Sequence, residues 1–211
     1  MEQATSDRDD SNASLYALIA SASGALPANE LVQRALQAMR SHLGMDVAYV
    51  SEFEGNRSIF RVVDAPGLEQ VVKPGDSLSL DDVYCRHILE GRLPQLMADT
   101  ADEPLAVATP ITRAIPVGKH VSVPIRMPDG SVYGMFCCLG FTADRSLRER
   151  DLQMLKVFAD LVAFEIGRDF AAAKAAREKE QRIRGVIENK EMSTLYQPIW
   201  RLENPQPIGF E

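Results

Sequence analysis

Apolar positions along the first part of the chain follow a helical period and then change to the period of strands. From Pro27 to Leu43 they recur at steps of three and four residues, and Gly44 follows directly. This pattern predicts an amphipathic helix. Residues 45–53 and 58–63 are rich in Val, Ile, Tyr and Phe and are joined by a turn-forming segment. They predict a β-hairpin.

Prolines and glycines break up the middle of the chain. They interrupt residues 64–80 and again residues 93–116, so we expect loops in both segments. Between them lies an apolar stretch that Asp81 or Asp82 can cap and Gly91 can end. This stretch predicts a short helix.

A second hairpin and a very long helix follow. The β-rich runs 119–127 and 131–141 flank a Pro-Asp-Gly turn, which predicts a hairpin. From about residue 146 to about residue 189 the period is helical. This helix carries more apolar surface than one sheet face can cover, so we expect a second copy of the chain to pack against it as a parallel homodimer. The alternative is a monomer in which the charged end of the helix is a solvated linker.

Both ends of the chain carry further elements. Residues 14–23 predict a short apolar helix, which Gly24 ends. Near the C-terminus, residues 195–202 and 207–211 predict two more strands. A lone hairpin is only marginally stable in water. We therefore expect these strands to begin a second domain that is truncated in this chain.

Composition narrows the class of protein. A chain of 211 residues with 45% hydrophobic and 25% charged residues fits one globular domain with appendages. Its net charge of −7 suits a phosphate backbone poorly, which argues against a nucleic-acid partner. No apolar run is long enough to span a membrane, and the N-terminus lacks the pattern of a signal peptide. Three cysteines without paired ligand spacing favour a cytoplasmic location.

The order of elements describes an α+β fold in which one antiparallel sheet is flanked by helices. Several segments together, in order and spacing, resemble the GAF sensory family. These segments are Val83–Gly91, Leu96–Thr100, His120–Ile125, Asp129-Gly130, Gly134–Cys138 and Asp151–Ala159. The resemblance covers about residues 26–170 and implies a GAF-like sensor domain. Residues 1–25 then form an N-terminal segment, and residues 171–190 a helical connector.

The tail resembles a different family. Tyr196-Gln-Pro-Ile, followed by Ile208-Gly-Phe-Glu, looks like the opening of an EAL domain, the cyclic di-GMP phosphodiesterase family. The resemblance implies that Gln197 contacts the substrate and that Glu211 is a metal ligand, for Mg²⁺ or Mn²⁺ in the complete domain. Residues 191–211 carry only its first strands. We therefore expect no catalytic residue, no certain cofactor and no phosphodiesterase activity in this chain.

The irregular middle segment and the short helix are the expected roof of a ligand pocket, because loops on a rigid scaffold carry binding groups. The ligand is an unknown small molecule, and a cyclic nucleotide, a metabolite, a tetrapyrrole and no ligand at all remain open. The expected lining side chains come from the short helix and the second hairpin. They are Tyr84, His87, His120, Ser122 and Phe136.

For the cysteines and for His87, a structural role is the alternative to a chemical one. Cys85 and His87 have a spacing that invites a metal or a covalent tetrapyrrole, but a buried cysteine and a hydrogen-bonded histidine are the commoner outcome. The Asp-x-Cys-Phe type of motif found in bilin-binding GAF relatives is absent, which disfavours light sensing. Cys137 and Cys138 point to opposite faces of one strand. Because both faces are apolar, burial on both sides is a simpler account than a strained vicinal disulfide.

These patterns lead to one functional expectation and two alternatives. We expect a bacterial GAF-type module that binds a ligand, dimerises and controls a cyclic di-GMP phosphodiesterase. In the first alternative, the parent protein is described as the enzyme that hydrolyses cyclic di-GMP to pGpG. In the second, the module is a dimerising scaffold whose pocket is filled by its own side chains.

Overall fold

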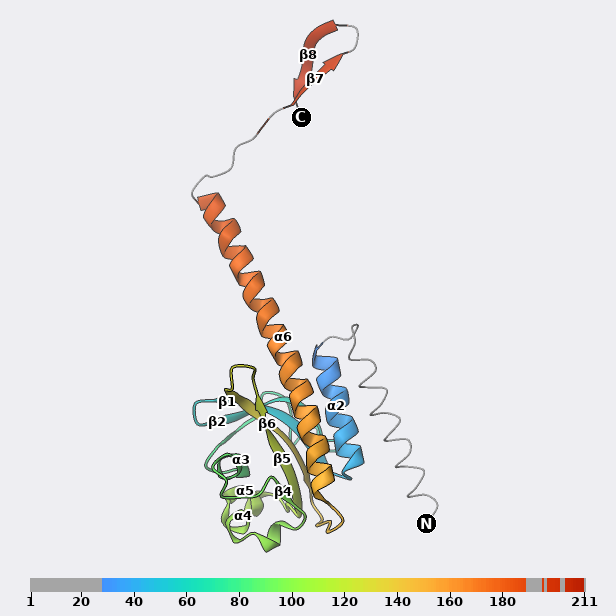
Figure 1. The fold of residues 1–211 in the computed structure, drawn as a ribbon, viewed down its shortest axis with the longest axis vertical. Coiled ribbons are helices and arrows are strands. Elements are labelled where there is room, and N and C mark those ends of the chain that lie inside the picture. The colour runs from blue at the N-terminus through green and yellow to red at the C-terminus, as the bar shows by residue number, and fades with distance from the viewer. Residues whose placement is uncertain (1–27, 189–194, 196, 202–203, 211) are drawn as a thin grey trace, which may run out of the picture. The chain divides into compact units, whose positions relative to one another are not determined.

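The computed structural model of the chain describes residues 28–188, 195, 197–201 and 204–210. These residues divide into two compact units between Asp169 and Phe170. The first unit contains a six-stranded sheet with the strand order β3-β2-β1-β6-β5-β4 (Figure 1). Every pair of neighbouring strands is antiparallel. The predicted α+β fold with an antiparallel sheet and flanking helices is confirmed.

The two predicted hairpins form the centre of the sheet. Their strands are β1 (Val47–Glu54), β2 (Arg57–Asp64), β5 (Lys119–Arg126) and β6 (Val132–Gly140). The hairpins join where β1 pairs with β6. This pairing depends on Gly134, because a Cβ atom there would lie 1.8 Å from the carbonyl oxygen of Ser51. Only glycine lets the two backbones come this close.

Two helices cover one face of the sheet. They are α2 (Ala28–His42) and α6 (Glu149–Glu188), and both match predicted helices. Leu36 and Met39 of α2 and Leu155 and Val162 of α6 are buried in one apolar cluster with Phe136 of β6. This cluster fixes the part of α6 that belongs to the first unit.

The opposite face carries short helices, which Figure 1 labels α3, α4 and α5. They are α3 (Tyr84–Leu89), α4 (Pro104–Ala108) and α5 (Pro110–Ala114), together with a 3-10 turn at Thr100–Asp102. The short strands β3 (Ser77–Ser79) and β4 (Leu96–Met97) form the two edges of the sheet. Segments 64–80 and 93–116 are therefore not wholly loops. Strands of two and three residues are too short to show a period. A proline opens both α4 and α5, where its missing N–H is not needed.

The start of α3 differs from the prediction. The helix begins at Tyr84, and its N-cap is Val83, without a side-chain hydrogen bond. A cap by Asp81 or Asp82 is therefore wrong. Instead, Asp81 lies 2.6 Å from Arg86 in an ion pair and accepts a hydrogen bond from Asn56 at 2.7 Å.

The second unit is described separately from the first. It contains the C-terminal part of α6 and a two-stranded antiparallel sheet of β7 (Pro198–Arg201) and β8 (Asn204–Phe210). The two strands predicted near the C-terminus are thus present. The helix predicted over residues 14–23 lies outside the described residues. Within the described part of the chain, no helix combines the length and apolar character that a membrane span requires.

Candidate ligand-binding site

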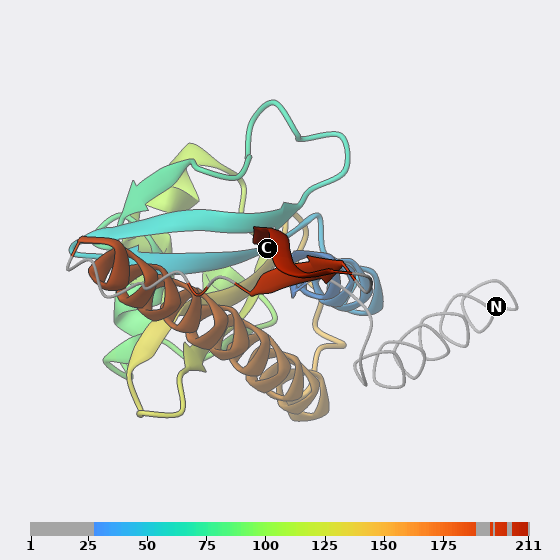
Figure 2. The ribbon, with the colours of Figure 1, turned by 90° about the horizontal axis from the view of Figure 1, so that it is seen from above.

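A cavity of about 520 Å³ opens on the sheet face opposite α2 and α6. Its volume lies in the range of small-molecule pockets, roughly 300–1,000 Å³. The segment that joins β2 to β3 arches away from these strands (Figure 2), and Leu68, Val71 and Val72 of that segment line the cavity. The opposite wall comes from α5 and the residues that follow it, including Ile111 and Val117.

The lining is mainly apolar. Its apolar and aromatic members are Val47, Tyr49, Phe60, Leu68, Val71, Val72, Leu78, Val83, Tyr84, Ile111, Ala114, Ile115, Pro116, Val117, Leu139 and Phe141. The other lining residues are Asp76, Ser77, Cys85 and His120. The described lining thus holds one carboxylate and no Lys or Arg. A few polar groups in an apolar wall orient a ligand without supplying strong charge.

Tyr84 and His120 are the two predicted site residues that line this cavity. Their rings meet edge to face, with centroids 5.0 Å apart and planes at 77°. The Tyr84 hydroxyl lies 2.5 Å from Oγ1 of Thr112, which donates a hydrogen bond to the carbonyl of Ala106. Burial raises the pKa of Tyr84, although the bond to Thr112 opposes this. Tyr84 is therefore a neutral phenol that ties α3 to α5 and to the sheet.

His120 and Ser122 lie on the same face of β5 because they are two residues apart. His120 is only 2% exposed, and its Nδ1 atom has no hydrogen-bond partner among the described residues. Ser122 is fully buried, and its Oγ atom likewise has none in that part of the chain. Ser122 does not line the cavity. It pairs in register with Cys137, away from the cavity surface.

His87 and Phe136 also lie away from the cavity. His87 is half-buried on α3, and its pKa is lowered by burial and by the charge of Arg92. Phe136 is buried in the cluster that contains α2 and α6, on the other face of the sheet. We expected these two residues to line the pocket with Tyr84, but neither is among the lining residues of the cavity. Phe136 precedes Cys137 by one residue, so its side chain points to the opposite face.

Several lining residues were not among the candidates. Tyr49 and Cys85 line the cavity, as do apolar residues of both segments that were expected to be loops. A signal for these segments exists in the sequence, because Leu68, Val71 and Val72 are apolar residues in a stretch otherwise rich in turn formers. Apolar residues in such a stretch indicate that it folds over a core.

The described residues contain no cluster suited to a metal ion. No three His, Cys, Asp or Glu side chains among them are arranged to bind one. Gln197, the expected substrate contact of the second domain, is exposed. Glu211, the expected metal ligand, lies outside the described residues.

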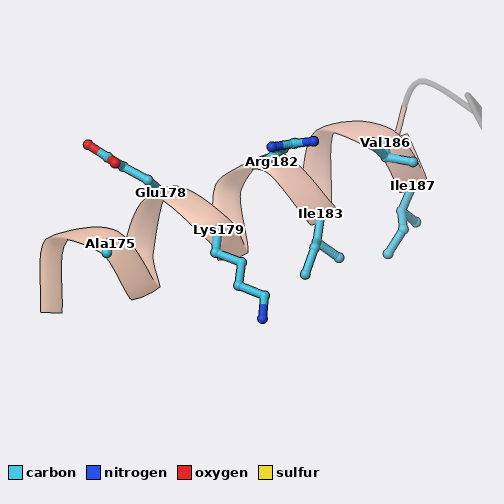
Figure 3. A pocket seen from close by; sticks show the side chains of 7 residues that line it. All are labelled: Ala175, Glu178, Lys179, Arg182, Ile183, Val186 and Ile187. Carbon is cyan, nitrogen blue, oxygen red and sulfur yellow. The ribbon is translucent and has the colours of Figure 1, made fainter. Parts of the chain in front are cut away.

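A second hollow lies along α6 in the second unit, with a volume of about 840 Å³. All of its lining residues belong to one helical stretch, from Ala175 to Ile187 (Figure 3). Lys179, Ile183 and Ile187 point to one side of the helix there. The two isoleucines are 52% and 57% exposed. This stretch is an open helix face with apolar residues on it.

Comparison with known proteins identifies the first unit. Residues 25–166 match the GAF domain family. The fold is similar to the GAF domain of a phosphoenolpyruvate-protein phosphotransferase from Acinetobacter, with a TM-score of 0.60 and 12% identity over 75% of this chain and 93% of that one. It is also similar to the chromophore-binding domain of an unusual bacteriophytochrome from R. palustris, with a TM-score of 0.62, 14% identity and coverage of 78% and 62%.

A third similar structure is the phycoerythrobilin-bound GAF domain of a cyanobacterial phytochrome, with a TM-score of 0.60 and 14% identity over 77% of this chain and 97% of that one. A comparison with curated protein sequences found no match. The low identities make these structures evidence for the fold alone. The family match covers most of the chain and agrees with the resemblance found in the sequence. The chain therefore belongs to the GAF family of sensory, ligand-binding domains.

Proposed function

We propose that this chain is the sensory part of a cytoplasmic bacterial regulator and that its cavity binds a small, largely apolar molecule. The cavity itself carries the proposal, because its volume of about 520 Å³ and its apolar wall suit such a ligand. His120 in this wall has a buried ring nitrogen without a partner among the described residues. A ligand with one hydrogen-bonding group would satisfy it. A multiply charged nucleotide suits the wall poorly, since the described lining has Asp76 and no cation.

Native mass spectrometry of the purified chain, under gentle conditions, tests for a bound molecule. Two alanines provide a matched pair of variants, because Ala114 lies exposed in the cavity wall and Ala108 lies exposed outside it. Ala114→Trp should lower the occupancy at least about tenfold by filling the cavity, and Ala108→Trp should leave it unchanged. Equal occupancy in the two variants, or no bound mass in the native chain, would overturn the proposal.

A ligand-free scaffold is the alternative. It requires the pocket to be filled by the protein's own side chains, with Tyr84, His87 and Phe136 packed together. The cavity and the separation of these residues favour the ligand-binding function over the scaffold.

The proposed module acts as a homodimer through α6. On this helix, Val157 and Phe164 are 60% and 65% exposed and are seven residues apart, so they lie on nearly the same side of two successive turns. The second unit adds Ile183 and Ile187, four residues apart. A second copy of the chain, aligned in parallel, would place each of these residues against its own counterpart. Closed two-fold pairs are the commonest arrangement of identical chains.

The module regulates a cyclic di-GMP phosphodiesterase domain that begins in the C-terminal residues. The hairpin of β7 and β8 contains most of the two motifs that resemble the start of an EAL domain, and this likeness supports the proposal. In the complete domain Gln197 would contact the substrate. Glu211 would contribute to a Mg²⁺ or Mn²⁺ site that activates water against the phosphodiester. A second candidate description, the parent protein as the enzyme that makes pGpG, rests on the same likeness.

The chain alone should not turn over cyclic di-GMP. A hard divalent cation requires several oxygen ligands, and one glutamate does not make such a site. We expect no linear product above a protein-free control in the presence of Mg²⁺ or Mn²⁺. A longer chain that carries the whole second domain should be active. Linear pGpG produced by the present chain would contradict this assignment.

A further inference from the structure

One polar atom in the cavity wall is buried without a hydrogen-bond partner. His120 lies on β5, where it pairs in register with Met97 of β4 and Leu139 of β6, and it is 2% exposed. Among the described residues that line the cavity, Nδ1 of His120 is the only buried side-chain nitrogen or oxygen atom without a partner. An unpaired buried polar atom lowers the stability of the fold. A ligand that hydrogen-bonds to this atom removes that cost.

Two hydroxyl groups of the cavity wall already have partners. The Tyr84 hydroxyl donates to Oγ1 of Thr112, because the proton of Thr112 goes to the carbonyl of Ala106. The Ser77 hydroxyl accepts a hydrogen bond from Nε of Arg57 at 3.0 Å. Both hydroxyl groups hold the protein's own elements together, so His120 is the better anchor for a ligand.

The charges of the wall favour an uncharged group on the ligand. The carboxylate of Asp76 lines the cavity and accepts a hydrogen bond from the Lys73 amide at 3.1 Å. The described lining contains no Lys or Arg, so a ligand carboxylate or phosphate buried there would lack a counter-ion. A hydroxyl group avoids this cost. Because a hydroxyl both donates and accepts, it can bond to Nδ1 of a neutral imidazole whether or not that atom carries the proton.

Aromatic rings line the cavity from several elements. Tyr84 meets His120 edge to face, with ring centroids 5.0 Å apart. Tyr49 and Phe60, which also line the cavity, have centroids 4.5 Å apart and planes at 40°. Aromatic rings in tilted or offset contact stabilise one another beyond the area that they bury. A ligand with a ring therefore suits this wall better than a flexible chain, which loses more rotational freedom when it binds.

We propose that the cavity binds a neutral phenol, whose hydroxyl hydrogen-bonds to Nδ1 of His120 and whose ring packs against the aromatic wall. The inference rests on the proposed ligand-binding function and names the chemical class of the ligand. His120 is then a specificity-determining residue. Without its ring nitrogen, a phenol buries an unpaired hydroxyl, whereas a hydrocarbon of the same shape loses nothing.

Two probes that differ by one hydroxyl test the proposal. They are para-propylphenol and propylbenzene, and titration calorimetry measures the binding of each to the full chain. We expect the native chain to bind the phenol at least as tightly as the hydrocarbon. The variant His120→Phe keeps a planar ring but lacks Nδ1. It should bind the phenol at least about tenfold more weakly than the native chain does, and its dissociation constant for the hydrocarbon should change by less than about threefold.

His87 provides the matched control. Its Nδ1 is also buried without a partner among the described residues, but His87 does not line the cavity. His87→Phe should therefore bind both probes as the native chain does. Equal weakening of both probes in His120→Phe, or the same loss of phenol binding in His87→Phe, would overturn the inference.

The native chain decides the question even if His120→Phe does not fold. In the native chain, the phenol should move the nitrogen NMR signal of His120 Nδ1 more than the hydrocarbon does. A phenol that binds about tenfold more weakly than the hydrocarbon, or that leaves this signal unmoved, would overturn the inference while the cavity keeps its ligand-binding function. Binding of neither probe would also overturn the inference, and the bound mass of the native chain would then decide the proposed function separately.

Discussion

Replacing Phe164 by alanine tests whether α6 joins two copies of the chain. Phe164 is 65% exposed on this helix, although its size makes it one of the most favourable residues to bury. A phenylalanine carries roughly 200 Å² of surface, so a partner that covers the exposed part removes about 130 Å² from water. At about 25 cal/mol per Å², this burial contributes about 3 kcal/mol in each copy.

A two-fold dimer contains this contact twice, for a sum of about 6 kcal/mol. We take about half of it, because interfaces pack incompletely and ordering the side chains costs entropy. A loss of about 3 kcal/mol raises the dissociation constant by about a hundredfold. Phe164→Ala should therefore shift the dimer toward monomer at concentrations where the native chain is paired.

Sedimentation equilibrium at micromolar concentration measures this shift. Val107→Ala is the control, because Val107 is also an exposed apolar residue, 47% exposed, but lies on α4. It should leave the dissociation constant unchanged. The reasoning is refuted if the native chain sediments at the monomer mass of 23.3 kDa throughout, or if both variants associate as the native chain does.

Two further predictions concern stability. Asp144 lies 3.5 Å from the buried Lys119 amine, and hydrogen bonds from Ser146, with the charge of Lys119, lower the pKa of its carboxyl. Asp144→Asn should therefore lower the free energy of unfolding by about 1–2 kcal/mol at pH 7. Urea titrations should show the difference shrink as the pH falls below about 4, because the unfolded chain takes up the proton first, and vanish once the native carboxyl with its lower pKa is protonated too. A constant difference down to pH 3 would contradict this. Gly134→Ala should lower the free energy of unfolding, measured in urea, by about 3 kcal/mol or more, because the new Cβ would lie 1.8 Å from the Ser51 carbonyl oxygen. The control Gly130→Ala, in an open turn with φ of 84°, should lower it by about 1 kcal/mol. Equal losses would contradict the close approach of β1 and β6.

The sequence predicted those elements whose signal is local. The two hairpins are long, rich in β-branched residues and bounded by turn formers, so their strands could be placed to within a few residues. Strand β4 has two residues and exists because it pairs with Val121 and His120 of β5. Such a strand is specified by its neighbour in space. A single chain does not reveal that neighbour.

For the candidate site, the sequence predicts which residues of one strand share a face, but not which residues of two strands lie together. Alternation along β5 places His120 and Ser122 on one face, and this could be read from the sequence. Their relation to Phe136 depends on the register between β5 and β6, in which Ser122 pairs with Cys137. A register shifted by one residue would have brought Phe136 to the cavity face. The turn between the strands does not fix this register, because a shift occurs near Ile125.

Strand β6 links the cavity to the long helix. Cys137 and Leu139 belong to the cluster on the cavity face, and Leu139 lines the cavity. Phe136 and Cys138 belong to the cluster packed against α2 and α6. Because both clusters are close-packed, β6 cannot shift toward one without disturbing the other. A ligand that displaces Leu139 therefore acts on a strand whose other face supports α6. Because both faces of β6 are buried, the strand is apolar at nearly every position. A strand with one solvated face would alternate apolar and polar residues.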